Sequence, residues 1–249
     1  SIALSPNGRY LVVAHYAKWV SGVTASPSIT VLDLDAGTRR NIAMASSPLA
    51  VAFGAASSAL VVTGEGFKLL DPALGSLQTL VPTPMAGADL PVKLATFPPE
   101  IIQASAGVSG DGKYIVGLAG TKDQEEDKTI HFIYNVETRE VGVTWIVSSP
   151  PLGPRVVSVD QTGSTFMLGW GLWSANTHML AEFPYVKGDL NIGTTAFDWS
   201  RSLIYAQMPL AVSGDTAAAI HHSLISYAHA SAITLIAAST LAARPRTPA

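Results

Sequence analysis

Short runs of apolar residues recur along the chain, and a polar turn precedes each of them. The five clearest runs are residues 10–16, 59–65, 114–120, 165–171 and 203–209. The turns before them are Asn7-Gly8, Ser57-Ser58, Asp111-Gly112, Thr162-Gly163 and Arg201-Ser202, spaced by 50, 54, 51 and 39 residues. A spacing this regular predicts a chain built from repeated structural units.

Each of the first three units continues with a second pair of apolar runs. The pairs are residues 28–33 with 38–43, 66–71 with 76–81, and 129–135 with 140–146. The runs are rich in Val, Ile, Leu and Tyr and are bounded by Gly, Asp, Asn and Ser, as in the strands of β-hairpins. The Asn-Gly and Asp-Gly turns tolerate the positive φ that tight hairpin loops require. We therefore expect four antiparallel strands in a unit of roughly 45–50 residues.

Four-stranded units repeating at this period predict an all-β fold, namely a β-propeller of four-stranded antiparallel blades, with about 4.5–5 blades present. The second strand of each unit is apolar on both faces, as expected where sheets stack on both sides. The fourth strand is more mixed, as expected at an outer rim. No terminal strand in the sequence is an evident partner for closing a ring, so we expect a portion of a larger propeller.

Three segments of the sequence also resemble a known repeat. SPNGRYLVVA at residues 5–14, followed by SITVLDLDAGT at residues 28–38, resembles the YVTN-type β-propeller repeat. Residues 61–64, VVTG, are close to the tetrapeptide that names it. The match is good over residues 1–81, fair over 104–146 and weak over 154–209. Such repeats define a fold and not an activity, and they occur in bacterial surface proteins, so the resemblance implies an extracellular or periplasmic location.

Two stretches depart from the repeat. Residues 82–100 contain five prolines, which resist both helix and central strand, so we expect a long loop on one face. Residues 216–249 contain eleven Ala and none of the 18 acidic residues or 21 glycines. We therefore predict propeller blades over residues 1–215 and an atypical Ala-rich tail over residues 216–249. The tail has three open interpretations: an Ala-rich helix over Thr216–His229, a poor strand at residues 231–239 (SAITLIAAS), or a segment that does not belong to the fold.

Composition and charge narrow the range of partners. Apolar residues make up 48% of the chain and charged residues 13%, which is enough apolar material for a large core. No run of 18 or more residues lacks a polar interruption, so we expect no membrane span. Lys and Arg are scattered and the net charge is −3, so no basic face is offered to nucleic acid. The chain has no Cys, which excludes disulfides and thiolate metal sites.

The start of the chain gives a further expectation. Ser1 leads directly into an apolar stretch, with no Met and no leader-like segment. We expect either that a leader has been removed or that the sequence is a piece of a longer chain.

A near-match to a phosphate-binding loop occurs at residues 107–113, GVSGDGK. Tyr114 stands where the pattern requires the Ser or Thr that meets Mg²⁺. The stretch also overlaps residues 109–118, which repeat the residue pattern of residues 5–14. A catalytic motif needs to occur once, whereas a structural motif recurs wherever the chain makes the same turn. We therefore interpret both as hairpin turns that join successive blades.

Candidate metal ligands are scattered. The acidic residues Asp123, Glu125, Glu126 and Asp127 lack the tight glycine turn of a Ca²⁺ loop, so a solvated loop is the favoured interpretation. His221, His222 and His229 have no nearby carboxylate to orient them. His15, His131 and His178 fall in or near strands of different blades, where packing is the more common role. We therefore predict no catalytic residue, no metal site and no cofactor.

Aromatic residues give the one candidate contact surface. Trp170, Trp173 and Tyr185 flank the loop GLWSANTH in the fourth unit. Aromatic side chains on a loop can stack on sugars or on apolar groups of a partner. Their alternative role is to wedge neighbouring blades together.

Two functions remain. The first is a non-catalytic binding or scaffold module with a protein or carbohydrate partner, and open blade edges would also allow association. The second is a propeller enzyme, such as a lactonase-like hydrolase or a quinoprotein-dehydrogenase-like chain. That enzyme needs three or more Asp, Glu or His side chains converging at the central channel. In either case we expect function in the parts that do not repeat, namely residues 82–100, 121–128 and 170–178.

Overall fold

In the computed structural model, every regular element among the described residues is a β-strand. The described residues are 1–15, 19–20, 23–24, 26–85, 100–121, 128–147, 157–169, 171–182, 195–198, 203–209, 222–228 and 235–239.

The first two sheets are four-stranded and antiparallel. Blade 1 contains β1 (Ile2–Leu4), β2 (Tyr10–His15), β5 (Ser28–Asp33) and β6 (Thr38–Ala43). A small ribbon of β3 (Trp19–Val20) and β4 (Val23–Thr24) lies between β2 and β5 in the sequence. Blade 2 contains β7 (Pro48–Phe53), β8 (Ala59–Thr63), β9 (Gly66–Asp71) and β10 (Ser76–Leu80).

Three further sheets follow. Blade 3 contains β12 (Ile101–Val108), β13 (Tyr114–Thr121), β14 (Lys128–Asn135) and β15 (Glu140–Val147), and β11 (Thr83–Pro84) adds a short parallel strand beside β15. Blade 4 contains β16 (Val157–Val159), β17 (Thr165–Leu168), β18 (Gly171–Ser174) and β19 (Met179–Glu182). Blade 5 contains β20 (Thr195–Asp198), β21 (Leu203–Pro209), β22 (His222–Ala228) and β23 (Leu235–Ser239).

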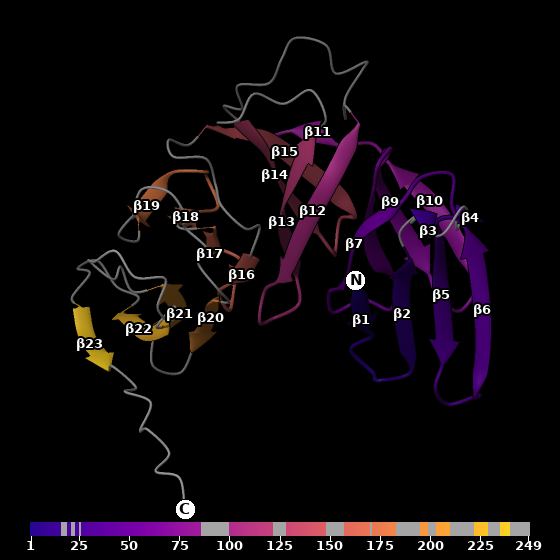
Figure 1. The fold of residues 1–249 in the computed structure, drawn as a ribbon, viewed down its shortest axis with the longest axis horizontal. Coiled ribbons are helices and arrows are strands. Elements are labelled where there is room, and N and C mark those ends of the chain that lie inside the picture. Colours follow the sequence, from indigo (N-terminus) through magenta and orange to yellow (C-terminus); the bar gives the residue numbers. More distant parts are fainter. Residues whose placement is uncertain are drawn as a thin grey trace, which may run out of the picture.

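The five blades lie along an arc in chain order, as Figure 1 shows. The first strands of the blades, β1, β7, β12, β16 and β20, lie on its inner side, and consecutive members of this set contact one another. Blades 1 and 5 lie at opposite ends of the arc (Figure 1). This arrangement confirms the predicted fold class, a β-propeller of four-stranded antiparallel blades.

A hydrophobic core fills each of the first three spaces between blades. Even-numbered residues of β2, including Tyr10 and Val12, pack against blade 2. Phe67 and Phe132, whose rings meet edge to face at a centroid distance of 5.1 Å, lie between blades 2 and 3. Val116, Phe166 and other residues fill the space between blades 3 and 4. The predicted burial of second strands on both faces holds for β8 and most of β13, which have neighbours on both sides.

The repeated phrase forms the same turn in blades 1 and 3. In blade 1 the Ser5 hydroxyl donates to Asn7 Oδ1 at 2.7 Å and accepts from the Tyr10 N–H at 2.8 Å. In blade 3 the Ser109 hydroxyl donates to Asp111 Oδ1 at 2.7 Å and accepts from the Tyr114 N–H at 3.0 Å. Residues 109–113 therefore form a hairpin turn between β12 and β13, which confirms the interpretation of the near-match to a phosphate loop.

Backbone hydrogen bonds link the blade 3 turn to its neighbours. The Ala55 N–H donates to the Gly112 carbonyl at 2.7 Å, which connects blades 2 and 3. The Gly110 N–H donates to the Asp160 carbonyl at 3.1 Å, and the Asp111 N–H to the Gln161 carbonyl at 2.9 Å, which connects blades 3 and 4. The predicted role of this turn as a joint between successive blades is confirmed.

Part of the predicted tail belongs to blade 5. Residues 222–228 and 235–239 are strands that pair with each other, and β22 also pairs with β21. The helix interpretation is therefore wrong for residues 222–228, since their backbone hydrogen bonds go to neighbouring strands. Within β22, Ile225 and Tyr227 are residue types that are enriched in strands. The rest of residues 216–249 lies outside the described part of the chain.

Candidate functional site

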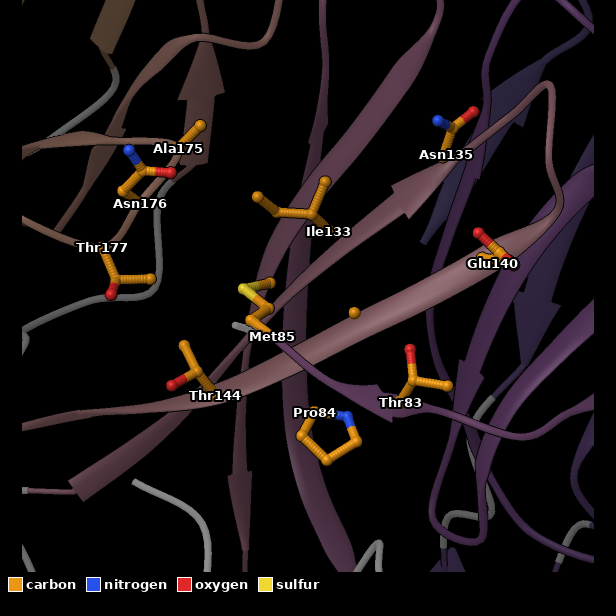
Figure 2. Close-up of a pocket in the computed structure, with 11 residues that line it drawn as sticks. Thr83, Pro84, Met85, Ile133, Asn135, Glu140, Thr144, Ala175, Asn176 and Thr177 are labelled. Carbon is orange, nitrogen blue, oxygen red and sulfur yellow. The ribbon is translucent and has the colours of Figure 1, made fainter. Parts of the chain in front are cut away.

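A pocket of about 330 Å³ lies between blades 3 and 4, and Figure 2 shows its lining. The wall from blade 3 comes from β11, β14 and β15, and the wall from blade 4 comes from the turn between β18 and β19. The lining residues are Thr83, Pro84, Met85, Ile133, Asn135, Glu140, Gly142, Thr144, Ala175, Asn176 and Thr177.

Strand alternation explains why β14 supplies the floor. Phe132 and Tyr134 point toward blade 2 and are buried in its core cluster. Ile133 and Asn135 therefore point the other way, toward blade 4. On β15, Gly142 pairs with Ile133 and Glu140 pairs with Asn135, so these four residues share one face of the sheet.

A short strap from the Pro-rich stretch closes one side of the pocket. Thr83 and Pro84 pair in parallel with Gly142 and Val143 of β15. The Thr83 hydroxyl donates to the Val141 carbonyl at 3.3 Å, and the Met85 N–H donates to the Val143 carbonyl at 2.9 Å. A Cβ on Gly142 would lie 3.2 Å from Met85 Cγ, so the absent side chain leaves the space that Met85 enters.

Two hairpin turns flank the pocket. In the β14–β15 turn, Asn135 Oδ1 accepts from the N–H groups of Glu137 at 2.9 Å and Thr138 at 3.2 Å. In the β18–β19 turn, the Thr177 N–H donates to the Ser174 carbonyl at 2.9 Å. Arg139 and Thr177 have φ values of 60° and 63°, and they are the non-glycine residues with positive φ among the described ones.

Glu140 supplies the charge of the pocket. It is the single charged side chain among the lining residues, and it is exposed to solvent. Within the described ranges, no side chain forms an ion pair or a hydrogen bond with its carboxylate. The remaining polar lining consists of three Thr hydroxyls and the two side-chain amides of Asn135 and Asn176.

The predicted aromatic surface is only partly described. Trp173 is 5% exposed and packs in the core between blades 3 and 4, and its indole Nε1 has no hydrogen-bond partner. This position agrees with the wedging role that the sequence left open. Trp170 and Tyr185 lie outside the described residues, so the contact surface of the three aromatic residues remains a prediction. The sequence analysis chose the stretch 170–178 for its aromatic residues, whereas the residues of that stretch that line the pocket are Ala175, Asn176 and Thr177.

Three histidines that the sequence analysis considered as candidate ligands lie in different surroundings. His131 of β14 is fully buried, its ring lies 4.8 Å from that of Phe166, and neither ring nitrogen has a hydrogen-bond partner. Burial lowers the pKa of His131 to about 3. The exposed His15 contacts Thr30 Oγ1 at 2.9 Å, and His178 is exposed at the β18–β19 turn. The side chains of His221, His222 and His229 and the acidic residues 123–127 lie outside what the structure describes.

Asp160 is the most heavily hydrogen-bonded carboxylate of the described chain. It is 6% exposed and accepts from the backbone or hydroxyl groups of Thr162, Ser164 and Thr165 at 2.6–3.5 Å. Burial alone would raise the pKa of Asp160, but these hydrogen bonds outweigh it and lower the pKa. Since every one of its partners belongs to the β16–β17 turn, its role is to fix that turn.

The inner strands show little catalytic chemistry. Across β1, β7, β12, β16 and β20, the described sequence has one acidic residue, Asp198, and no His. Between blades 4 and 5, the hydroxyls of Ser158 and Thr195 lie 2.6 Å apart. In the part of the chain that the structure describes, no group of three or more His, Asp or Glu side chains could hold a metal ion.

Comparisons with known proteins support the fold. No family model matches the chain, and no curated protein does. The solved structure of regucalcin from Agrobacterium tumefaciens strain C58, described as a calcium-binding protein, matches with a TM-score of 0.51 and 15% identity, covering 95% of this chain and 72% of regucalcin. TolB from Acinetobacter baumannii matches with a TM-score of 0.45 and 13% identity, covering 92% of this chain and 51% of TolB. The chain thus spans about half the length of TolB. Its similarity to regucalcin is one of fold, and the narrower YVTN-type assignment stays a prediction.

Proposed function

We propose that this propeller is a non-catalytic binding module and that the pocket between blades 3 and 4 holds a small ligand. The observation that carries the proposal is the lining itself, in which polar side chains surround an apolar floor. Its volume of about 330 Å³ falls within the range of about 300–1,000 Å³ usual for small-molecule sites.

The position of the pocket supports the same function. Its floor lies on β14 and β15, which are paired along all eight residues of each strand, so the floor residues are rigidly held. Its walls come from residues 83–85 and 175–177, which belong to two of the three non-repeating stretches. A rigid sheet with variable loops at its margin is the usual construction of a binding site.

The enzyme alternative has less support. It requires acidic and His side chains converging at the inner strands, and the described inner strands contribute Asp198 alone. The regucalcin structure is described as that of a calcium-binding protein. Calcium binding is not part of this proposal, because the described residues contain no group of three or more side chains that could hold a metal ion.

The proposal includes an extracellular or periplasmic location, which rests on the resemblance to the YVTN-type repeat. No helix in the described portion is long and apolar enough to cross a membrane.

A fragment screen with a pocket-filling variant tests the proposal. We expect ligand-observed NMR to find small polar aliphatic compounds that bind the full chain. Gly142→Leu should abolish their binding, because the new side chain occupies the space above the floor. The melting temperature of Gly142→Leu verifies that the variant is folded. The proposal fails if no fragment binds. It also fails if the fragments bind Gly142→Leu and Glu140→Gln as tightly as they bind the unmodified chain.

A further inference from the structure

The one charged group of the described pocket lining is an acceptor. Glu140 contributes a carboxylate, and Lys and Arg are absent from the described lining. The Thr83 hydroxyl already donates its proton to Val141, so it presents lone pairs to the pocket. The Asn176 amide and the hydroxyls of Thr144 and Thr177 can each donate or accept. The Asn135 oxygen already accepts from two backbone N–H groups, which leaves its NH2 group as a donor. A carboxylate with no cationic side chain beside it in the described lining favours a ligand that carries a cationic donor group.

Arg139 is next to Glu140 in the sequence, and its charge acts on Tyr134. Burial raises the pKa of Tyr134, and the positive charge of Arg139 partly offsets that rise. Tyr134 belongs to the core between blades 2 and 3, on the side of β14 that faces away from the pocket. Among the described residues, Arg139 forms no ion pair with Glu140.

The polar groups lie at two ends of the pocket, with apolar groups between them. Figure 2 shows Glu140 and Thr83 toward one end and Asn176 and Thr177 toward the other, with Met85 and Ile133 in the middle. Pro84 and Ala175 extend the apolar surface. This order matches a short aliphatic chain with a polar group at each end. The described lining has no aromatic side chain, so it lacks the stacking platform that a sugar ring would use.

We propose that the pocket binds a linear aliphatic ammonium group that carries a second hydrogen-bonding group at its far end. The ammonium lies against the Glu140 carboxylate, the methylene chain lies over Met85 and Ile133, and the far group contacts Asn176 and Thr177. This assignment rests on the proposed binding function and narrows its ligand class. A free amino alcohol or diamine and the side chain of a lysine residue share this chemistry.

Titrations of the full chain with matched compounds test the assignment. The probes are 5-amino-1-pentanol, the uncharged 1,5-pentanediol and the anionic 5-hydroxypentanoate, followed by NMR chemical-shift changes. We expect 5-amino-1-pentanol to bind at least about tenfold more tightly than 1,5-pentanediol, because a charge-assisted hydrogen bond replaces a neutral one. We expect 5-hydroxypentanoate not to bind. A further probe, Nα-acetyl-lysine methylamide, distinguishes a peptide source from a free amine.

Charge-removing variants connect the effect to one carboxylate. Glu140→Gln should weaken binding of 5-amino-1-pentanol about tenfold and leave that of 1,5-pentanediol unchanged. Glu137→Gln is the matched control, because Glu137 is exposed in the same turn but does not line the pocket, and it should change neither affinity. Equal affinities for the amine and the diol, or an unchanged affinity in Glu140→Gln, would overturn the assignment. If neutral fragments bind and amines do not, the assignment fails while the proposed binding function stands; if nothing binds, both fail.

Discussion

Four hairpins, each between the last two strands of a blade, place a residue in the left-handed region. In blades 1 and 2 it is glycine, Gly37 and Gly75, with φ of 63° and 70°. In blades 3 and 4 it is Arg139 and Thr177. A side chain in this conformation costs about 1–2 kcal/mol, and a β-branched residue such as Thr is rarer still. The two strained positions border the pocket, where such strain is commonly found.

Exchanging glycine at these positions tests the strain. Thr177→Gly should raise the free energy of unfolding by about 0.5–1 kcal/mol, because the left-handed backbone loses its clash. Gly37→Ala should lower it by about 1 kcal/mol through the backbone alone, since no atom lies within 4 Å of the added Cβ. Urea unfolding of both variants measures the two effects. A destabilised Thr177→Gly would show that contacts of the threonine side chain outweigh its strain.

His131 is a polar residue held in an apolar space. Its ring is stacked on Phe166, its nitrogens are unpaired, and its pKa is lowered to about 3. The unfolded chain therefore binds a proton more readily than the native chain between about pH 6.5 and pH 3. Stability falls as the pH drops through this window, because protonation favours the unfolded state.

Replacing the ring should remove this dependence. Wild-type protein should lose up to about 2 kcal/mol of stability between pH 7 and pH 5 through His131. Over the same pH interval, His131→Leu should lose less stability than the wild type, by up to about 2 kcal/mol. Urea unfolding at the two pH values measures the difference, with the exposed His178→Leu as control. Identical pH dependence in wild type and His131→Leu would contradict the neutral, buried state of His131.

Among the elements, the turn at residues 109–113 contacts two neighbouring blades, whereas the related turn at residues 5–9 leaves Gly8 facing open space. The Asn7-Gly8 and Asp111-Gly112 turns have the same internal hydrogen bonds, and both glycines have positive φ, 73° and 71°. Their surroundings differ, because Gly112 meets Ala55 of blade 2 while Gly8 faces open space. Gly112 is thus required both by its conformation and by the close approach of a second backbone.

Alanine at the two positions separates these requirements. Gly8→Ala should cost about 1 kcal/mol, from backbone conformation alone. Gly112→Ala should cost about 2–4 kcal/mol, because its Cβ would lie 2.8 Å from the Ala55 nitrogen and would strain or break the hydrogen bond between blades. Equilibrium unfolding measures both. Equal losses would mean that the joint between blades 2 and 3 contributes no stability.

At the scale of the whole molecule, blade 1 has one covered and one open face. Ala3 packs toward blade 2, so its neighbours Ile2 and Leu4 point away from it. They are 67% and 53% exposed, and they lie beside Val13 and Leu11 on the same face. An apolar sheet face of this kind favours association.

Polar substitution of this face tests that expectation. Sedimentation velocity of the chain should show association that increases with concentration. The double variant Ile2→Thr and Leu4→Thr should shift the distribution toward monomer, because it removes exposed apolar area without disturbing the strand. The control is Leu74→Thr, since Leu74 is 73% exposed in the turn between β9 and β10, away from this face. A concentration-independent monomer in the unmodified chain would contradict the expectation.

Local sequence patterns are sufficient to predict the blades and their turns. Strand alternation and turn residues act over a few neighbours, so β5, β6 and β9 have the predicted bounds. The turn at residues 109–113 was predictable for the same reason, because its pattern recurs at residues 5–9, but its contacts with blades 2 and 4 were not.

The pocket and the surroundings of single side chains depend instead on how the blades pack together. Residues 83–85 and 175–177 are about ninety positions apart, and the stacking of blades 3 and 4 brings them together around Gly142. The burial of Trp173 and His131 likewise depends on which face of a strand meets the next blade. A local pattern specifies that a strand forms and turns, but contact between blades depends on how whole sheets pack.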